Sequence, residues 1–252
     1  MANRNWTKEE TIVAFNVYCK IPFKKSSKTN PTIIKYAKII GRSPSALNMK
    51  IGNFGRLDPE LKKQGITGLI NGSKLEEIVW DEFNGNWDKL AFKSETLIAD
   101  FQNKKIEEDF DFENFPKGKD RETTIKTRVN QGFFRSTILS SYNLKCCITG
   151  LSITDFLVAS HIKPWSKDIE NRTNPHNGLC LNSIHDKAFD KGFITVTPDF
   201  KVKVSEYFND YSKEKPVNEF FIKYNNQKIV KPERFLPTTE FLDYHFQNVF
   251  IK

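Results

Sequence analysis

Cysteine is scarce in this chain of 252 residues, which contains only four. None of them belongs to a CxxC pair, and the adjacent Cys146 and Cys147 do not have the spacing of zinc ligands. The sequence therefore predicts neither a disulfide framework nor a structural zinc site. We expect reduced, partly buried thiols at Cys19, Cys146, Cys147 and Cys180.

Long apolar runs are also absent. No stretch approaches the roughly 20 apolar residues that a membrane-spanning helix needs. The first residues, MANRNWTKEE, lack the apolar core of a signal peptide. The hydrophobic content of 38% is typical of a soluble globular protein. We therefore expect a cytoplasmic protein that binds no membrane, and its length allows two domains.

Acidic residues are the minority among the charged side chains. The chain has 31 Asp and Glu against 39 Lys and Arg, which gives a formal net charge of +8. The excess is concentrated in residues 1–60, where eleven basic residues face four acids. This balance indicates a polyanionic partner such as nucleic acid, although composition alone does not identify that partner.

Residues 1–95 have the pattern of a helical domain. Within it, residues 31–57 predict one helix, a turn at Gly41 and a second helix capped by Ser43. This order is typical of a helix-turn-helix. An ordinary helical hairpin with a solvated basic face is the alternative. If the second helix does lie in a DNA groove, the polar residues available to face it include Lys50, Asn53 and Arg56.

A linker is predicted at residues 96–122, where an acidic cluster is followed by proline and glycine. Residues 123–252 then form the second domain, which opens with a predicted helix. On that helix Arg128, Gln131 and Arg135 recur every three or four residues and therefore share one face. We expect this face either to bind a DNA phosphate or to form ion pairs within the protein.

Three of the four histidines fall within residues 157–190. The segment LVASHI predicts a buried strand that ends at His161, because a lysine and a proline follow shortly after it. Residues 147–150 are expected to form the first strand and the turn of a hairpin, with residues 155–161 as its second strand. Apolar residues in 179–189 recur at roughly helical spacing, which predicts a helix after a polar loop. His161 is therefore expected to face a loop from the end of a strand.

The motif SHIKPW…NGLCLN…HDKAFD resembles that of the HNH nucleases with a ββα-metal active site, in the branch found in restriction-like proteins. The resemblance covers about residues 123–252. It implies that His161 is the general base that activates a water molecule, a role suited to the pKa of histidine. It also implies that Asn177 holds the histidine loop in place, and that Asp186, nine residues further on, ligates a divalent metal.

The chain departs from the common HNH pattern at Ser160, where the family usually has an acidic or histidine ligand before the base. We expect the helix to supply both carboxylates, since Asp186 and Asp190 lie one turn apart and can converge on one Mg²⁺ or Mn²⁺ ion. His185 remains a catalytic candidate, and it replaces Asp186 as ligand only if the helix register differs by one residue. The alternative is that the histidines are ordinary core residues and the aspartates an exposed helix face.

The predicted fold class is α+β, with an N-terminal all-α helix-turn-helix-like domain and a C-terminal ββα-metal HNH nuclease domain. The resemblance implies a metal-dependent endonuclease of double-stranded DNA in restriction or phage defence. Lys163 is a further candidate DNA contact. One alternative is a DNA-binding regulator with a degenerate nuclease domain, which Ser160 motivates. The other is a nuclease that acts on RNA or on structured DNA.

A homodimer is expected on geometric grounds. One ββα-metal site hydrolyses one strand per event, whereas a two-fold pair places two sites on opposite strands of a palindromic site. A monomer that nicks and rebinds is the alternative, because no dimer signature appears in the sequence.

Overall fold

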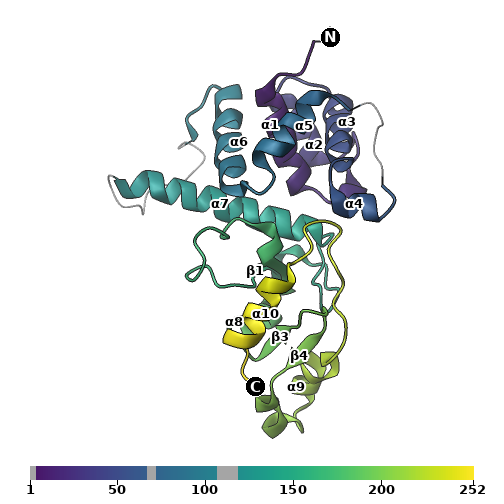
Figure 1. Ribbon diagram of the computed structural model, residues 1–252, viewed down its shortest axis with the longest axis vertical. Coiled ribbons are helices and arrows are strands. Elements are labelled where there is room, and N and C mark those ends of the chain that lie inside the picture. The colour runs from purple at the N-terminus through teal and green to yellow at the C-terminus, as the bar shows by residue number, and fades with distance from the viewer. Residues whose placement is uncertain (1–3, 67–71, 107–118) are drawn as a thin grey trace. The chain divides into compact units, whose positions relative to one another are not determined.

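The computed structural model describes residues 4–66, 72–106 and 119–252 (Figure 1). The chain divides into two compact units, Met1–Thr137 and Ile138–Lys252. The first unit carries helices, and the second combines helices with two small antiparallel sheets, which confirms the predicted α+β class. Among the described residues, no helix is both long and apolar enough to cross a membrane.

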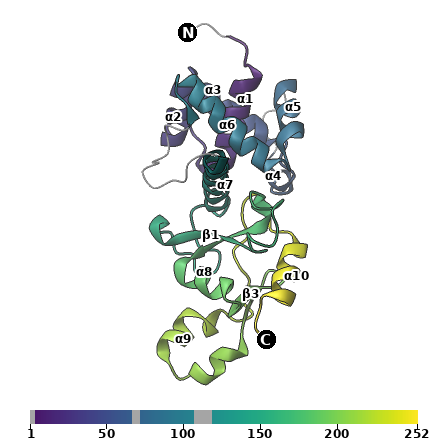
Figure 2. The same ribbon diagram turned by 90° about the vertical axis from the view of Figure 1, so that its left-hand side faces the viewer.

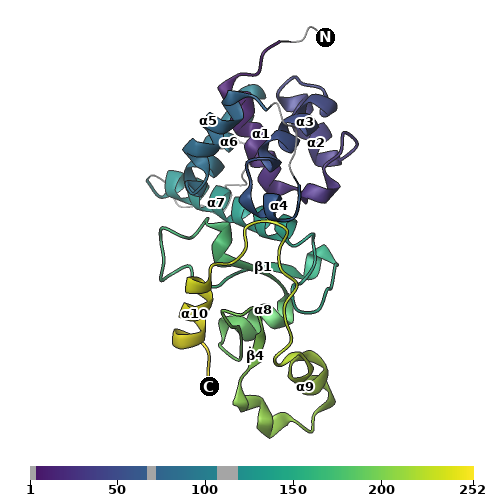
Figure 3. The ribbon, with the colours of Figure 1, turned by 45° about the vertical axis from the view of Figure 1, so that its right-hand side comes forward.

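Several helices of the first unit begin at capping side chains. Thr7, Asn30 and Ser43 each accept a hydrogen bond from a backbone N–H of the first helical turn, which satisfies groups that a helix leaves unpaired. The elements are α1 (Lys8–Lys20), η1 (Phe23–Lys25), α2 (Pro31–Ile39), α3 (Pro44–Gly55), α4 (Pro59–Lys63), α5 (Lys74–Phe83) and α6 (Trp87–Phe101). Helix α1 packs against α2, α3, α5 and α6 (Figure 3).

An aromatic cluster forms the core of the first unit. The ring of Phe15 on α1 stacks on Phe54 of α3 at a centroid distance of 4.8 Å and tilts against Trp80 of α5 at 5.2 Å. Tyr18, one turn along α1, donates its hydroxyl to the carboxylate of Asp58 at 2.6 Å. Aromatic pairs of this kind add to the stabilisation that their buried area provides, so α1 is the element that holds the bundle together.

The face of α3 that was expected to read DNA lies inside the unit instead. Lys50 is buried and forms an ion pair with the buried carboxylate of Glu76 on α5, and Asn53 donates to the same carboxylate oxygen at 3.0 Å. Arg56 pairs with Glu77 at 2.9 Å. A buried carboxylate needs a cation and donors beside it, and α3 supplies them. The prediction that Lys50 and Asn53 face a groove is therefore corrected.

Helix α7 (Lys119–Ser141) begins in the first unit and ends in the second, because the division at Thr137 falls within it. Helix α6 continues to Phe101, past the expected domain limit at residue 95. Residues 107–118, which hold the acidic part of the expected linker, lie outside the described residues. The predicted limits of the helical domain, the linker and the nuclease domain stay a prediction, with residues 1–95, 96–122 and 123–252 respectively.

The second unit is organised around two hairpins. Its elements are η3 (Thr154–Phe156), β1 (Leu157–His161), η4 (Pro175–Asn177), β2 (Gly178–Asn182), α8 (Ser183–Asp190), β3 (Ile194–Val196), β4 (Val202–Val204), η5 (Glu206–Tyr211), α9 (Lys215–Phe220), η6 (Ile222–Tyr224) and α10 (Thr239–Asn248). Strand β1 pairs with β2 and β3 with β4, both antiparallel. Helix α8 packs against both strands of the first hairpin (Figure 2).

The hairpin that carries His161 differs from the predicted one. Its register places Leu157 opposite Asn182 and His161 opposite Gly178. Residues 147–150, the predicted first strand and turn of the hairpin, form a turn that ends in a glycine with positive φ and contain no strand. That prediction is wrong because the partner strand follows β1 in sequence, after the long polar loop, rather than preceding it.

Helix α8 begins later than the apolar spacing indicates. Leu179 and Leu181 belong to β2, in which Gly178 to Leu181 are all buried. Asn182 ends the strand and caps the helix, since its Oδ1 accepts from the backbone nitrogens of Ile184 at 3.1 Å and His185 at 2.9 Å. A strand that is buried on both faces cannot be told from a helix by periodicity, which explains the error.

The end of α8 is fixed by a glycine and by α10. Gly192 has a φ of +74°, and a Cβ at this position would clash with the carbonyl oxygen of Val249. His245 of α10 stacks on Phe189 at a centroid distance of 3.7 Å. Its Nε2 donates to the Phe189 carbonyl at 3.2 Å, and its Nδ1 accepts from the Thr195 hydroxyl at 2.8 Å. These contacts pack the C-terminal helix on α8 and β3.

We predict that Glu76→Gln lowers the free energy of unfolding by about 3–5 kcal/mol, because it leaves the buried ammonium of Lys50 without a counter-charge. Equilibrium urea unfolding measures the change. The matched control is Glu77→Gln, which removes a pair whose carboxylate is 49% exposed and should change stability by no more than about 1 kcal/mol. Equal unfolding midpoints for the two variants would contradict the role assigned to the buried pair.

Candidate functional site

His161 is the last residue of β1. The segment that follows it, residues 162–177, connects β1 to β2 and is called the histidine loop. Its Nε2 lies 2.9 Å from the carbonyl oxygen of Arg172. Since a carbonyl oxygen only accepts hydrogen bonds, Nε2 carries the proton and the lone pair is on Nδ1. Burial lowers the pKa of His161 below its ordinary value. The ring is therefore neutral at physiological pH, and Nδ1 is the nitrogen that accepts a proton.

Trp165 and Arg172 set the orientation of the imidazole. The Trp165 indole meets the His161 ring edge-on, with centroids 5.4 Å apart. Arg172 donates from Nε to the Trp165 carbonyl at 2.9 Å, and its guanidinium lies 4.9 Å from the indole centroid. His161 contacts both members of this cation–π pair. The sequence analysis missed both residues, because no spacing pattern distinguishes them from other loop residues.

Asn177 joins the two ends of the loop. Its Oδ1 accepts from the backbone nitrogen of Lys163 at 2.8 Å, and its Nδ2 donates to the carbonyl of the same residue at 3.1 Å. The backbone nitrogen of Ile162 donates to the Asn177 carbonyl at 3.0 Å. The buried Asn177 amide both accepts from and donates to the backbone of Lys163. It thereby adds a pair of hydrogen bonds beyond the end of the β1–β2 pairing. This geometry fits the predicted role of Asn177 in holding the histidine loop.

Between the two ends of the loop, Asp168, Asn171 and Asn174 form a belt of hydrogen-bonded polar side chains. Asn171 donates from its backbone nitrogen and its Nδ2 to Asp168 at 3.2 and 3.0 Å, and Asn174 donates from Nδ2 to Asn171 at 2.9 Å. Lys163 pairs with Asp168 at 2.9 Å, which raises the pKa of the Lys163 ammonium. The sequence analysis missed this belt, although its three-residue spacing of short polar side chains is visible in the sequence.

The carboxylates of α8 lie in an environment that favours a cation. Burial raises the pKa of half-buried Asp186, and the nearby charge of Asp190 raises it further, whereas the hydroxyl of Ser160 lowers it. Burial also raises the pKa of Asp190, against the effect of two neighbouring lysines. Ser160 Oγ is buried, and among the described residues it has no hydrogen-bond partner of ordinary geometry. The charge of Asp190 thus acts on the carboxylate of Asp186, and a cation beside the two carboxylates would stabilise their ionised forms.

These residues fit a hard divalent ion that keeps most of its ligands as water or phosphate oxygens. In the portions of the chain that the structure describes, no three His, Cys, Asp or Glu side chains converge as a metal-binding group. The oxygen donors of Asp186, Asp190 and Ser160 suit Mg²⁺ or Mn²⁺ better than zinc, which prefers nitrogen and sulfur ligands. The four cysteines are buried and form no disulfide, and Cys146, Cys147 and Cys180 are not grouped as metal ligands.

His185 is a core residue. It is 2% exposed. Its Nε2 donates to the carbonyl of Phe220 at 2.6 Å, and its Nδ1 accepts from the side-chain nitrogen of Asn182 at 3.2 Å. Both ring nitrogens are thus engaged in the interior, while Asp186 is the helix residue beside Ser160. The structure therefore corrects the candidate role of His185 in catalysis and removes the reason for a shifted helix register.

The remaining candidate DNA contacts lie on separate elements. Arg128, Gln131 and Arg135 are all exposed on α7, at the spacing that places them on one face. Lys163 is more than two-thirds buried in the histidine loop, paired with Asp168. The three α7 residues are thus exposed, and Lys163 is paired within its own loop.

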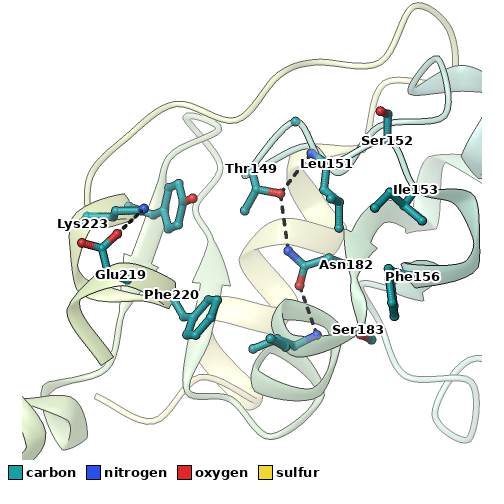
Figure 4. Close-up of a pocket in the computed structure, with 13 residues that line it drawn as sticks. Thr149, Leu151, Ser152, Ile153, Phe156, Asn182, Ser183, Glu219, Phe220 and Lys223 are labelled. Atoms are coloured by element: carbon teal, nitrogen blue, oxygen red, sulfur yellow. Dashed lines mark hydrogen bonds and ion pairs between the residues drawn. The ribbon is translucent and has the colours of Figure 1, made fainter. Parts of the chain in front are cut away.

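A groove of about 890 Å³ lies at the other end of the β1–β2 hairpin from His161 (Figure 4). Its lining is mainly apolar and includes Leu151, Ile153, Phe156 and Phe220. The groove borders Asn182, which stands opposite Leu157 at the start of β1, whereas His161 ends that strand. It is therefore not part of the histidine site.

Comparison with known proteins agrees with this geometry. The family model of the HNH endonucleases matches residues 146–197, a range that contains β1, the histidine loop, β2, α8 and β3. No curated protein matches the chain. The matched range holds His161, Asn177 and Asp186 at the positions described above. Residues 146–197 of this chain are therefore similar to the HNH endonucleases.

Proposed function

We propose that the chain is a metal-dependent endonuclease that hydrolyses phosphodiester bonds of double-stranded DNA. The observation that carries the proposal is the anchored, neutral imidazole of His161 within the HNH domain. Hydrolysis near neutral pH needs a base that is unprotonated there and is held in one tautomer. The net charge of +8 supports a polyanionic substrate.

In the proposed reaction, a water oxygen attacks the phosphorus while one of its protons passes to Nδ1 of His161. The bond between phosphorus and the leaving sugar oxygen breaks as the new bond forms. The resulting imidazolium keeps its Nε2–H on the Arg172 carbonyl, so the dipole of that carbonyl stabilises the new positive charge. Asn177 keeps the loop closed, which holds the base in its orientation.

Asp186 and Asp190 would hold the divalent cation, Mg²⁺ or Mn²⁺, one ion in each site. When bound, the ion supplies positive charge for the phosphate and for the leaving oxygen. Ser160 takes the place of the usual ligand before the base. Its buried hydroxyl acts on the carboxylate of Asp186 and lowers the pKa of that group, which favours the ionised form that a metal requires.

A role in restriction or phage defence follows from the resemblance of the motif and is part of the proposal. We also propose a homodimer, since two sites related by a two-fold axis cut both strands of a duplex. Ser160 is the specific observation that favours the second candidate, a DNA-binding regulator with a degenerate nuclease domain. Metal-dependent cleavage of supercoiled plasmid, with a chelator as control, separates the two, and RNA tests a third substrate class.

We predict that His161→Ala lowers the cleavage rate by about 10²- to 10⁴-fold while duplex binding is retained, because it removes the base and no phosphate contact. Single-turnover plasmid cleavage and anisotropy with labelled duplex measure the two quantities. The control is His176→Ala in the same loop, whose ring bonds the Leu236 carbonyl at 2.8 Å; its rate should stay within tenfold of wild type. A comparable loss in both variants would indicate loop disruption rather than a base.

The pH dependence of cleavage should follow the lowered pKa of His161. A base is active when unprotonated, so the rate is sustained above the pKa and is lost as the pH falls through it. Because burial depresses this pKa below 6.5, the midpoint of the acid limb of kcat/KM is expected below pH 6.5. Measurement at saturating metal checks the prediction. A midpoint above 7 would contradict it.

We predict that Asp186→Asn and Asp190→Asn each weaken Mg²⁺ or Mn²⁺ binding at least about tenfold, since each removes a charged oxygen ligand. Titration calorimetry with the metal alone measures the affinity. Asp199→Asn, in the exposed turn between β3 and β4, is the matched control and should leave it unchanged. His185→Ala should lower the unfolding temperature rather than the metal affinity, because its ring bonds the interior. Loss of metal binding in His185→Ala at unchanged stability would refute the assignment.

A further inference from the structure

Acidic residues are missing from one long stretch of the first unit. Residues 11–57 contain nine Lys and Arg and no Asp or Glu. The stretch runs through most of α1, all of η1 and α2, and α3. Its positive charges must therefore be balanced by acids from other elements, or else face solvent or a partner.

Four of the nine basic residues are balanced from within the unit. Each is less than one-fifth exposed and pairs with a glutamate that lies outside the stretch. The pairs are Lys20 with Glu95 at 2.5 Å, Arg42 with Glu10 at 2.6 Å, Lys50 with Glu76, and Arg56 with Glu77 at 2.9 Å. Lys20, Lys50 and Arg56 connect α1 and the α3 region to α5 and α6, and Arg42 connects the α2–α3 turn to the start of α1. The charge of these residues is therefore used in packing.

The other five are lysines, and all of them are exposed. They lie within fifteen residues on η1, the loop that follows it and α2: Lys24, Lys25, Lys28, Lys35 and Lys38. Considering only partners that the structure describes, the last four form no ion pair. We call these four residues, Lys25, Lys28, Lys35 and Lys38, the η1–α2 lysine face.

The backbone beneath this face is held by side-chain hydrogen bonds. Asn30 caps α2 through Oδ1, which accepts from Thr32 N at 2.9 Å, and its Nδ2 donates to the Lys25 carbonyl at 3.1 Å. Ser26 donates to Asn48 of α3 at 2.7 Å, which ties the loop to the neighbouring helix. The lysines are thus carried on an ordered backbone, and Lys35 and Lys38 lie one turn apart on α2.

We propose that the η1–α2 lysine face binds the phosphate backbone of double-stranded DNA. The inference rests on the proposed function for the identity of the polyanion. Lysine ammonium groups on an ordered surface neutralise phosphates and release condensed counterions, which gives affinity without reading bases. No arginine lies on this face to make bidentate contacts with guanine. The face therefore supplies sequence-independent affinity, in place of the α3 residues that the fold buries.

The test replaces the four lysines by glutamine and measures duplex affinity by fluorescence anisotropy with chelator present, so that no cleavage occurs. The affinity is followed in KCl from about 50 to about 200 mM. Each phosphate contact adds about 0.9 to the slope of log K against log salt, so the quadruple variant should lose about 3 to 4 from the slope. Its affinity at low salt should fall by about a hundredfold or more.

The matched control is a second quadruple variant, with Lys62, Lys63, Lys74 and Lys93 replaced by glutamine. These lysines are exposed in the same unit, so the change in net charge is identical. The control should lose less than about 1 from the slope. Far-UV circular dichroism and the unfolding temperature show whether both variants are folded.

Two results would overturn the proposal, and they differ from failure of the nuclease assignment. If the two variants have equal slopes of log K against log salt and metal-dependent plasmid cleavage is intact, the lysine face does not bind DNA and the nuclease assignment is unaffected. If the variant of the lysine face loses binding only to RNA or to vesicles with acidic lipid, and its slope for duplex DNA is unchanged, the face binds that other partner. Absence of plasmid cleavage with a selective fall in duplex slope would keep the DNA-binding face and reject the nuclease.

Discussion

The double hydrogen bond between the Asn177 side chain and the Lys163 backbone is the constraint on which the site depends. Ordering a polar loop carries an entropic cost for every residue that is fixed. The hydrogen bonds of the Asn177 amide offset part of that cost at the loop ends, where they extend the β1–β2 pairing beyond His161. The belt of Asp168, Asn171 and Asn174 continues the ordering inward. With the loop closed, the Arg172 carbonyl is in place to select the tautomer of His161.

The surroundings of each of the four histidines determine whether it serves in packing or is available for chemistry. Each has a ring nitrogen within hydrogen-bond distance of a backbone carbonyl. His245 is buried against Phe189, and burial lowers its pKa to about 4, so it stays neutral in the core. His185 has both nitrogens engaged. His161 instead ends a strand beside a polar loop, and this position makes it the base in the proposed mechanism.

Basic residues in the first unit divide in the same manner. The same acid-free stretch supplies interior cations such as Lys50 and exposed ones such as Lys35. Interior cations are needed because burying a carboxylate such as Glu76 without a cation is strongly unfavourable. Exposed cations have no such internal role, so their concentration on η1 and α2 requires another reason. Net charge alone indicated a polyanionic partner, and the fold indicates which lysines are available to it.

The sequence by itself determined the α+β class, the helical N-terminal region and the HNH motif, because caps, turn residues and motif spacing act locally. It also placed His161 at a strand end, since the lysine and proline that follow disfavour further strand. Only the tertiary structure decided which strand pairs with β1, because β2 is buried on both faces and looks helical in sequence. It also decided that Asp186 rather than His185 lies beside Ser160, and that Lys50 is internal. Those outcomes depend on partners distant in the chain, which local spacing does not encode.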